Sequence, residues 1–344
     1  MKLLVTGGLG YIGSHTAYLA IQEGHDVVIL DNLSRGNKEA LPPGAKWFSA
    51  SLQNEQELDK IFRANQFDGV LHFAAYCYVG ESVEKPQLYY ENNLMGSLHL
   101  IHKMMEYKVP CLVLSSTAAV YGNPFTEGKK WGKITEDFPR NPMNPYGRTK
   151  ATLEEILEDY QKKGKLNFIS LRYFNAAGAH PEGILGEVHN PETHLIPILL
   201  QTALGKRKEA QIYGTHYPTP DGTCVRDFIH VWDLARAHLL ALEKMDSFSG
   251  EAFNLGAERG YSIREVVETV KKITQVDFSV IEGPPRPGDP PYLVASSEKA
   301  RELLGWSPQY SDLETIVTHA FQWFQNPTWK FTYEKIPSSN KEDS

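Results

Sequence analysis

The sequence is poor in cysteine, in long hydrophobic runs and in excess positive charge, and each scarcity excludes a class of protein. Its three cysteines, Cys77, Cys111 and Cys224, form no C-x-x-C pair, so neither a disulfide framework nor a cysteine-based zinc site is expected. The long uncharged stretch from Val109 to Phe125 is interrupted by polar residues and proline, which argues against a membrane helix. A formal net charge of −7 gives no footprint for nucleic acid or an anionic membrane.

The composition that remains is that of a globular protein. The chain has 344 residues, of which 41% are hydrophobic and 22% charged, and domains average roughly 150 residues, so about two are expected. His99 and His102 stand three positions apart, but no acidic residue completes a ligand set, so no metal is expected. The opening run MKLLVTGG is too short for the hydrophobic part of a secretory signal, and a cytoplasmic location is expected.

Short apolar runs alternate with helical patterns in the first half of the chain. Near-continuous apolar runs predict strands over 2–6, 27–30, 69–73, 111–116 and 168–174. Helical periodicity predicts helices over 12–23, 54–64, 86–107 and 145–163. This alternation predicts an α/β fold of the Rossmann type, with a doubly wound parallel sheet.

The pattern changes after about residue 178, where proline and glycine become frequent between shorter elements. We therefore expect a dinucleotide-binding domain over 1–178, to which segments around 228–256 return. A smaller α/β lobe over 179–330 would bind the substrate at the carboxyl edge of the sheet, where open α/β sheets hold ligands. The polar segment 336–344 is expected to be a flexible tail.

A glycine-rich turn follows the first expected strand. In TGGLGYIG, the spacing of Gly7, Gly10 and Gly13 lets backbone amides and a helix N-terminus approach a pyrophosphate. The second strand ends at Asp31, whose carboxylate suits a ribose 2′-hydroxyl and repels a 2′-phosphate, so NAD is favoured over NADP. Arg35 lies near enough in sequence to weaken that preference. A simple chain reversal or a turn-forming Asp-Asn pair would explain either feature singly, but not both together.

Three polar side chains predict the chemistry. SSTAAVYG places Thr117 at the carboxyl end of a buried strand, and NPYGRTK opens a helix with Tyr146 and Lys150 one turn apart. A phenol has a pKa of about 10, so we expect the Lys150 ammonium and an oxidised nicotinamide to lower the pKa of Tyr146. Tyr146 would then serve as the acid–base group, while Thr117 hydrogen-bonds the substrate hydroxyl.

Together these motifs resemble the extended short-chain dehydrogenase/reductase family. Within it, the UDP-glucose 4-epimerases are similar over residues 2 to about 324, through GESVEKP, YYENN, LRYFNAAGAHPEG, YPTPDGTCVRDFIHVWDLA, FNLG and RPGD. The resemblance implies NAD as cofactor and interconversion of UDP-galactose and UDP-glucose, a step of galactose metabolism. The sugar C4 would be oxidised, the 4-ketose would rotate, and the hydride would return to its other face. A homodimer joined through the helices expected at 86–107 and 145–163 is also implied.

The resemblance further implies a set of site residues. For NAD they are Gly7, Gly10, Tyr11, Ile12, Gly13, Asp31, Asn32, Ser34, Arg35, Gly36, Ser51, Leu52, Phe73, Ala74, Ala75, Asn92, Tyr146, Lys150 and Phe174. For the nucleotide sugar they are Thr117, Tyr146, Asn175, His194, Leu195, Gln211, Tyr213, Arg226, Arg286 and Asp289. Arg226 and Arg286, expected in loops of the second lobe, suit a diphosphate. Ser51 stands where related enzymes have aspartate, and Cys77 stands where many have lysine.

The sequence leaves open which UDP-sugars are accepted and whether another function is carried by the same fold. Leu293 occupies the family position that gates the space around the sugar C2 substituent, and its small size predicts some activity on UDP-GlcNAc and UDP-GalNAc. A one-residue shift would put Tyr292 at the gate and reverse this prediction. Related dehydratases and decarboxylases carry acidic residues where this chain has Ala118 and Ala119, which favours epimerisation. Another UDP-sugar 4-epimerase, acting on a pentose or uronate, and a non-catalytic NAD sensor on the same fold remain the alternatives.

Overall fold

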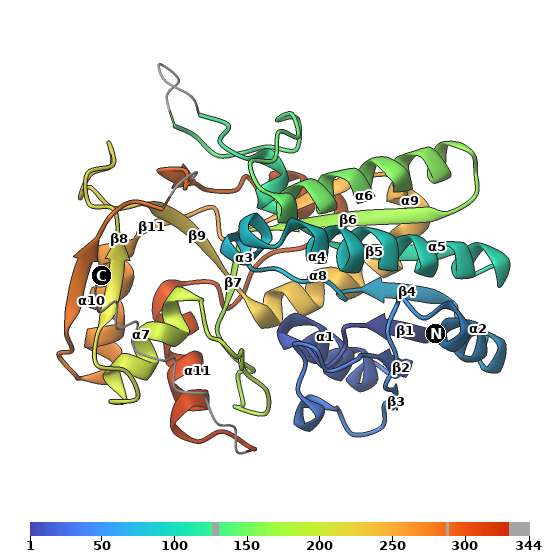
Figure 1. The fold of residues 1–344 in the computed structure, drawn as a ribbon, viewed down its shortest axis with the longest axis horizontal. Helices are drawn as coiled ribbons and strands as arrows, with labels where there is room; N and C mark the ends of the chain where they lie inside the picture. Colours follow the sequence, from blue (N-terminus) through green and yellow to red (C-terminus); the bar gives the residue numbers. More distant parts are fainter. Residues whose placement is uncertain (126–130, 287–288, 330–344) are drawn as a thin grey trace, which may run out of the picture.

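A seven-stranded, fully parallel sheet forms the centre of the computed structural model, which describes residues 1–125, 131–286 and 289–329 (Figure 1). The strand order is β10-β6-β5-β4-β1-β2-β3. The strands are β1 (Lys2–Thr6), β2 (Asp26–Leu30), β3 (Lys46–Phe48), β4 (Gly69–His72), β5 (Cys111–Thr117), β6 (Asn167–Tyr173) and β10 (Ala252–Leu255). The order reverses at β1, so the predicted doubly wound α/β fold is confirmed.

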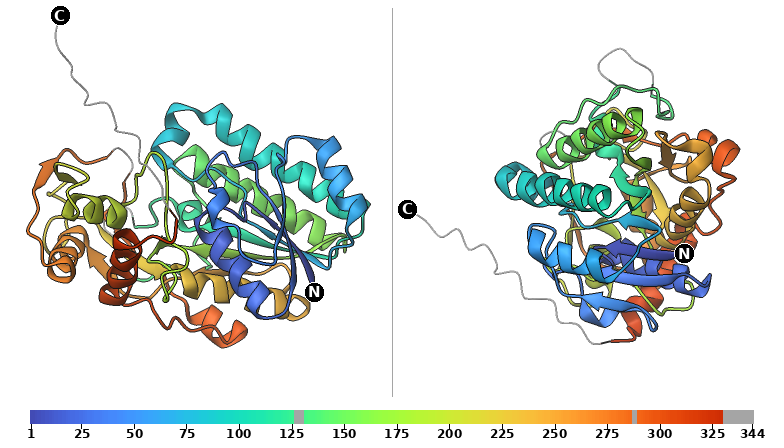
Figure 2. Two further views of the ribbon diagram at one scale, coloured as in Figure 1. Left: turned by 90° about the horizontal axis from the view of Figure 1, so that it is seen from below. Right: turned by 90° about the vertical axis from the view of Figure 1, so that its right-hand side faces the viewer.

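Helices cover both faces of this sheet, as Figure 1 and the right-hand view of Figure 2 show. Alternation along β1 explains why: Leu3 and Val5 enter the core under one helix layer, and Leu4 enters the core under the other. The first layer contains α1 (Tyr11–Gln22) and α8 (Val231–Glu243). The second contains α2 (Glu55–Ala64), α5 (Gly96–Glu106) and α6 (Pro145–Lys162).

The helix expected over 86–107 forms as three consecutive segments: α4 (Pro86–Tyr89), a π-helical stretch (Tyr90–Met95) and α5. Within the π-helical stretch, the buried amide of Asn93 accepts a hydrogen bond from Tyr76 N at 2.8 Å and donates one to Tyr76 O at 2.9 Å. Such π-helical stretches occur frequently at functional sites. Here the stretch also carries Asn92, which lines the cavity described below.

The second lobe has its own core and two small sheets. One sheet joins β7 (Asn175–Ala177), β9 (Val225–His230), β11 (Gly260–Ser262) and β13 (Tyr292–Leu293), and the other pairs β8 (Ala210–Tyr213) with β12 (Val280–Gly283). Its main helices are α7 (Leu195–Ala203), α10 (Ile263–Thr274) and α11 (Leu313–Gln325). The short elements are α3 (Val79–Glu84), α9 (Met245–Phe248), 3₁₀ turns at Lys38–Ala40 and Ala118–Tyr121, and a π turn at Ala300–Leu304.

The chain crosses between the lobes more than once. β9 lies in the second lobe, but α8 follows it directly and packs against α1, and β10 then pairs with β6 at the edge of the large sheet. The expected tail, 336–344, lies outside the described residues, and the predicted domain limits stay a prediction.

No helix in the described parts of the chain is both long and apolar enough to cross a membrane.

Candidate active site

A solvent-open cavity lies at the carboxyl ends of the central strands. Its lining contains most of the residues predicted to hold the cofactor. These are Gly7, Gly10, Asp31, Asn32, Ser34, Arg35, Gly36, Ser51, Leu52, Phe73, Ala74, Ala75 and Asn92, with Leu30, Ala50 and Tyr76 in addition. The family-like motifs therefore converge on one cavity at the switch point of the sheet, where dinucleotides bind in folds of this type.

The glycine loop forms a cradle that larger side chains would fill. Gly7 has a φ of +69°, and a Cβ there would lie 2.6 Å from the backbone nitrogen of Ala74. Gly10 is the N-cap of α1, and no side chain caps the amides of the first turn, which also contains no acidic residue. Free amides at a helix N-terminus bind anionic groups, so the residues present fit the pyrophosphate of a dinucleotide.

Asp31 ends β2 on the wall of this cavity and is fixed by its own loop. One carboxylate oxygen accepts from Leu33 N at 2.8 Å and the other from Leu9 N at 3.0 Å. Arg35 lies on the same wall, but its guanidinium forms a two-oxygen ion pair with Glu81 at 2.8 and 2.7 Å. Since Arg35 already has an anionic partner, it is poorly placed to attract a 2′-phosphate, and the preference for NAD expected from Asp31 is strengthened.

Four other predicted cofactor residues lie outside the cavity lining: Tyr11, Ile12, Gly13 and Phe174. Ile12 and Gly13 lie in the first turn of α1. The Tyr11 hydroxyl donates to Gly178 O at 2.7 Å, linking α1 to the segment after β7. Phe174 is buried directly after β6. Ser51, the serine that replaces an expected aspartate, remains on the cavity wall, where its hydroxyl accepts from Gln53 N at 3.2 Å.

Thr117, Tyr146 and Lys150 are brought together as the sequence predicts. Thr117 is the last residue of β5, and Tyr146 and Lys150 lie in the first two turns of α6. All three are buried. The Lys150 Nζ donates to Ser115 O at 2.7 Å, so the helix is tied to the strand that carries Thr117. Because β5 neighbours β4, whose continuation Phe73–Ala75 lines the cavity, the three residues stand beside the expected nicotinamide position.

The predicted lowering of the Tyr146 pKa includes the charge of an oxidised nicotinamide and stays a prediction; the protein groups alone act in the opposite direction. Burial is the largest influence and raises the pKa of Tyr146 well above its usual value, and charge on nearby Cys77 raises it further. A side-chain hydrogen bond with Thr117 opposes the increase. Burial also lowers the pKa of Lys150 to about 8. Desolvation penalises the charged forms of both groups, and the positive charge of the expected nicotinamide would oppose this effect at Tyr146.

The residues predicted for the nucleotide sugar fall into two contacts in the second lobe. Arg226 Nη2 pairs with Asp289 Oδ1 at 2.5 Å, and the Arg286 guanidinium lies 4.0 Å from the centre of the Tyr213 ring. Arg226 is in β9 rather than in a loop, contrary to expectation, because the segment pairs with both β11 and β13. Gln211 is two residues before Tyr213 in β8.

Two further predicted substrate positions lie where the lobes meet. The Asn175 amide, at the start of β7, donates to Asp227 O at 2.8 Å. His194 is the N-cap of α7 and Leu195 is its first residue. Asn175 follows β6 of the large sheet, and His194 and Leu195 follow the loop after β7. These residues therefore lie on the chain segment that runs from the large sheet into the second lobe.

Strand register separates Leu293 from Tyr292. In the parallel pairing of β13 with β9, Leu293 is opposite Arg226 and Tyr292 is opposite Val225. Paired residues share a face of the sheet, so Leu293 lies on the Arg226 side. Tyr292 instead stacks on Trp131, with ring centres 5.7 Å apart and planes 7° apart. The role of Leu293 as the gate stays a prediction.

The sequence interpretation missed one group of polar residues. Glu187, His189, Glu192 and His194 offer four ligand atoms that lie within 4.8 Å of one another. Burial and the neighbouring Glu187 charge raise the pKa of Glu192 to about 7. The spacing E-x-H-x-x-E-x-H was the sequence signal that could have indicated this group. It was missed because only the histidine pair His99 and His102 was considered as metal ligands.

A model of the NAD dependent epimerase/dehydratase family matches residues 3–256. The chain belongs to this family. It is 48% identical over 325 residues to a UDP-glucose 4-epimerase of Halalkalibacterium halodurans, covering 94% of this chain and 95% of that protein.

Solved structures agree with the family assignment. One UDP-glucose 4-epimerase structure is 44% identical, has a TM-score of 0.91 and matches 96% of this chain and 100% of its own. The UDP-glucose 4-epimerase of Bifidobacterium longum, solved with NAD+ and UDP, is 36% identical with a TM-score of 0.88, over 95% of this chain and 99% of its own. The fold and the family are therefore established together.

Proposed function

We propose that this protein is a UDP-glucose 4-epimerase that uses NAD to interconvert UDP-galactose and UDP-glucose. The observation that carries the proposal is the meeting of Thr117, Tyr146 and Lys150 beside a glycine-lined cavity that fits a dinucleotide. Ala118 and Ala119 follow Thr117, so no carboxylate is present there to drive elimination. The family membership and the high identity to named UDP-glucose 4-epimerases support the same reaction.

Each part of the site has a role in this reaction. When bound, NAD supplies the hydride acceptor and donor at the sugar C4. Tyr146 takes the proton from the C4 hydroxyl and later returns it, and Thr117 holds that hydroxyl in line. Lys150, whose Nζ donates to Ser115 O, would favour the phenolate by its positive charge. Arg286, which pairs with no carboxylate in the described part of the chain, and Arg226, whose pair with Asp289 uses one terminal nitrogen, would retain the diphosphate while the sugar turns.

Proton NMR of the purified protein with UDP-galactose, without added NAD, tests this function first. Conversion to UDP-glucose is the expected result, and it would also show that the cofactor stays bound between turnovers. If no conversion occurs even after NAD is added, the proposal fails. UDP-pentoses and UDP-uronates would then be tested as substrates, and a tightly bound NAD with no turnover on any of them would indicate an NAD sensor.

Replacing Asp31 with asparagine is expected to weaken NAD binding by about 10- to 100-fold, since a hydrogen bond to a charged group contributes roughly 1.5–3 kcal/mol. Binding of NADP should improve relative to NAD, because the charge that repels a 2′-phosphate is gone. Calorimetric titration of cofactor-stripped protein with each dinucleotide measures both effects. Asp26→Asn, an exposed change at the start of β2, is the matched control. Unchanged affinities for both dinucleotides in Asp31→Asn would contradict this role.

Replacing Leu293 with tyrosine is expected to narrow the substrate range. We propose that the parent protein also converts UDP-GalNAc, and the bulkier side chain should lower that activity at least about 10-fold relative to UDP-galactose, a typical effect of pocket shape. Rates on the two substrates, compared by NMR, give the ratio. Tyr292→Phe keeps the ring that stacks on Trp131 and should leave the ratio unchanged. The absence of measurable conversion of UDP-GalNAc by the parent protein would contradict the prediction.

We also propose that the protein is a cytoplasmic homodimer with the domain limits given above. The helices that would form the dimer interface are α5 and α6 with the π-helical stretch that joins α4 to α5. Exposed Val83, in nearby α3, and exposed Met95, at the end of the π-helical stretch, support an interface on this side of the molecule. Sedimentation equilibrium tests the oligomeric state, and a monomer at micromolar concentration would contradict it.

A further inference from the structure

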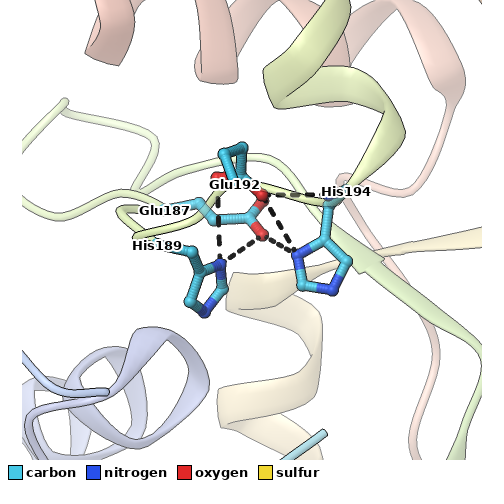
Figure 3. A group of neighbouring side chains, drawn as sticks. All are labelled: Glu187, His189, Glu192 and His194. Atoms are coloured by element: carbon cyan, nitrogen blue, oxygen red, sulfur yellow. Dashed lines mark hydrogen bonds and ion pairs between the residues drawn. The ribbon is translucent and has the colours of Figure 1, made fainter. Parts of the chain in front are cut away.

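Four potential metal ligands converge on the loop that leads into α7 (Figure 3). Glu187, His189, Glu192 and His194 all come from one eight-residue segment, and their side chains turn toward one point. Glu187, His189 and Glu192 are buried, whereas the His194 side chain is 40% exposed. Two imidazoles and two carboxylates are thus enclosed at a place where the second lobe meets the first.

The separations between their atoms bracket the ligand spacing of a zinc coordination sphere, and the shortest of them is at present a hydrogen bond. His194 Nδ1 lies 2.5 Å from Glu187 Oε1 and 3.5 Å from Glu192 Oε1. His189 Nδ1 lies 3.1 Å from Glu187 Oε1 and 3.9 Å from Glu192 Oε2. With Zn–N and Zn–O distances of about 2.0–2.2 Å, tetrahedral ligands are roughly 3.3 Å apart, within the range found here.

Two of the ligand atoms, His189 Nδ1 and Glu192 Oε2, are buried and face each other across the group. Glu192 Oε2 has no hydrogen-bond partner, and the nearest acceptor to His189 Nδ1 is Glu187 Oε1 at 3.1 Å. A buried polar atom left unpaired is costly, and a cation between these two would satisfy both. The other oxygen of Glu192 accepts from the backbone nitrogens of Thr193 and His194, both at 2.9 Å. These bonds fix the carboxylate in the orientation that aims Oε2 at His189, as outer contacts do for metal ligands.

Bonds from both lobes hold the loop in place. The Asn37 amide donates to Val188 O at 3.1 Å, from the cofactor side of the molecule. Arg207 Nη2 donates to Glu192 O at 3.2 Å, from the second lobe. Both hydrogen bonds are accepted by backbone oxygens, so they do not occupy the ligand atoms of the four side chains. The site is therefore supported by its surroundings rather than formed by a free surface cluster.

We propose that Glu187, His189, Glu192 and His194 bind one zinc ion. Imidazole nitrogen together with carboxylate oxygen suits Zn²⁺, whereas Ca²⁺ and Mg²⁺ prefer shells made of oxygen. Four protein ligands leave no open position, which is typical of a structural site. The ion would fix the loop that delivers His194 and Leu195 to the second lobe. The proposal rests on the geometry alone and does not depend on the proposed reaction.

Zinc titration of the chain without any affinity tag tests the proposal. The protein is stripped with a chelator, freed of the chelator and titrated calorimetrically with zinc chloride. We expect one zinc per chain with a dissociation constant below 1 μM. His189→Ala and Glu192→Gln should each weaken binding by at least about 100-fold, because losing a direct ligand costs no less than losing an outer contact, which costs about 10- to 100-fold. His102→Ala and Glu182→Gln alter exposed residues and should bind zinc as the parent does.

X-ray absorption of the zinc-loaded parent is a second measurement that needs no variant. Two imidazoles and an otherwise oxygen-only shell are expected, and a sulfur ligand would place the ion on a cysteine and overturn the proposal. Absence of stoichiometric binding by the parent would also overturn it, as would native-like affinity in both variants. Circular dichroism identifies a variant that fails to fold, and the parent data then decide.

Discussion

Replacing Tyr146 with phenylalanine is expected to lower the epimerisation rate by 10²- to 10⁴-fold, the usual contribution of general acid–base catalysis. The variant keeps the ring that is buried beside Thr117 but loses the only phenol that α6 places next to that strand end. No proton can then leave the C4 hydroxyl through this residue. Initial rates with saturating UDP-galactose, measured by coupled oxidation of the UDP-glucose formed, give the ratio directly.

Tyr160→Phe provides the matched control, because Tyr160 lies on the same helix, near its far end. Tyr160 is partly buried against the sheet core, and its ring is kept in phenylalanine. Because it belongs to none of the predicted site contacts, the rate of this variant should stay within about twofold of the parent. Circular dichroism should show the same helical content in both variants. If Tyr146→Phe retained activity within a few-fold of the parent, another group would have to move the proton.

The spacing of Tyr146 and Lys150 was sufficient to predict that they meet, but not how far burial shifts their pKa values. Helical geometry places residues four apart on one face, and a strand end fixes Thr117 opposite them. A pKa instead depends on how much water reaches the group, which is set by packing from distant segments. Cys77, whose charge raises the pKa of Tyr146, comes from a loop after β4 that no local pattern could place.

Most of the large sheet, but not all of its elements, could be predicted from the sequence. Five strands of the large sheet follow from apolar runs because a strand buried on both faces needs them. β3 escaped prediction because it is an edge strand of three residues with an exposed lysine. The π-helical stretch Tyr90–Met95 also escaped, since helical periodicity does not distinguish an added residue held by Asn93 from regular α-helix. The group of Glu187, His189, Glu192 and His194 depends on the path of a loop. Hydrophobic periodicity predicts helices and strands, but it does not predict the path of a loop.

Replacing Glu154 with glutamine is expected to lower the free energy of unfolding by about 3–5 kcal/mol, the usual cost of breaking a buried ion pair from one side. Glu154 is 1% exposed and Arg172 is 5% exposed. Arg172 Nε lies 3.1 Å from each carboxylate oxygen, and Nη2 lies 2.5 Å from Oε2. The variant would leave the Arg172 cation buried without a counter-charge. Urea unfolding followed by tryptophan fluorescence measures the change.

The neighbouring Glu155→Gln is the control, since its side chain is 59% exposed and lies 3.9 Å from Arg140; exposed pairs contribute about 0–1 kcal/mol. Adding Arg172→Gln to Glu154→Gln should restore part of the stability, because the stranded charge is removed. A loss below 1 kcal/mol in the single variant would contradict the argument. Ser116, beside Thr117, also donates to Glu154, one turn beyond Lys150. The same buried carboxylate thus locks the catalytic strand to the catalytic helix, so its loss should loosen the site before the fold is lost.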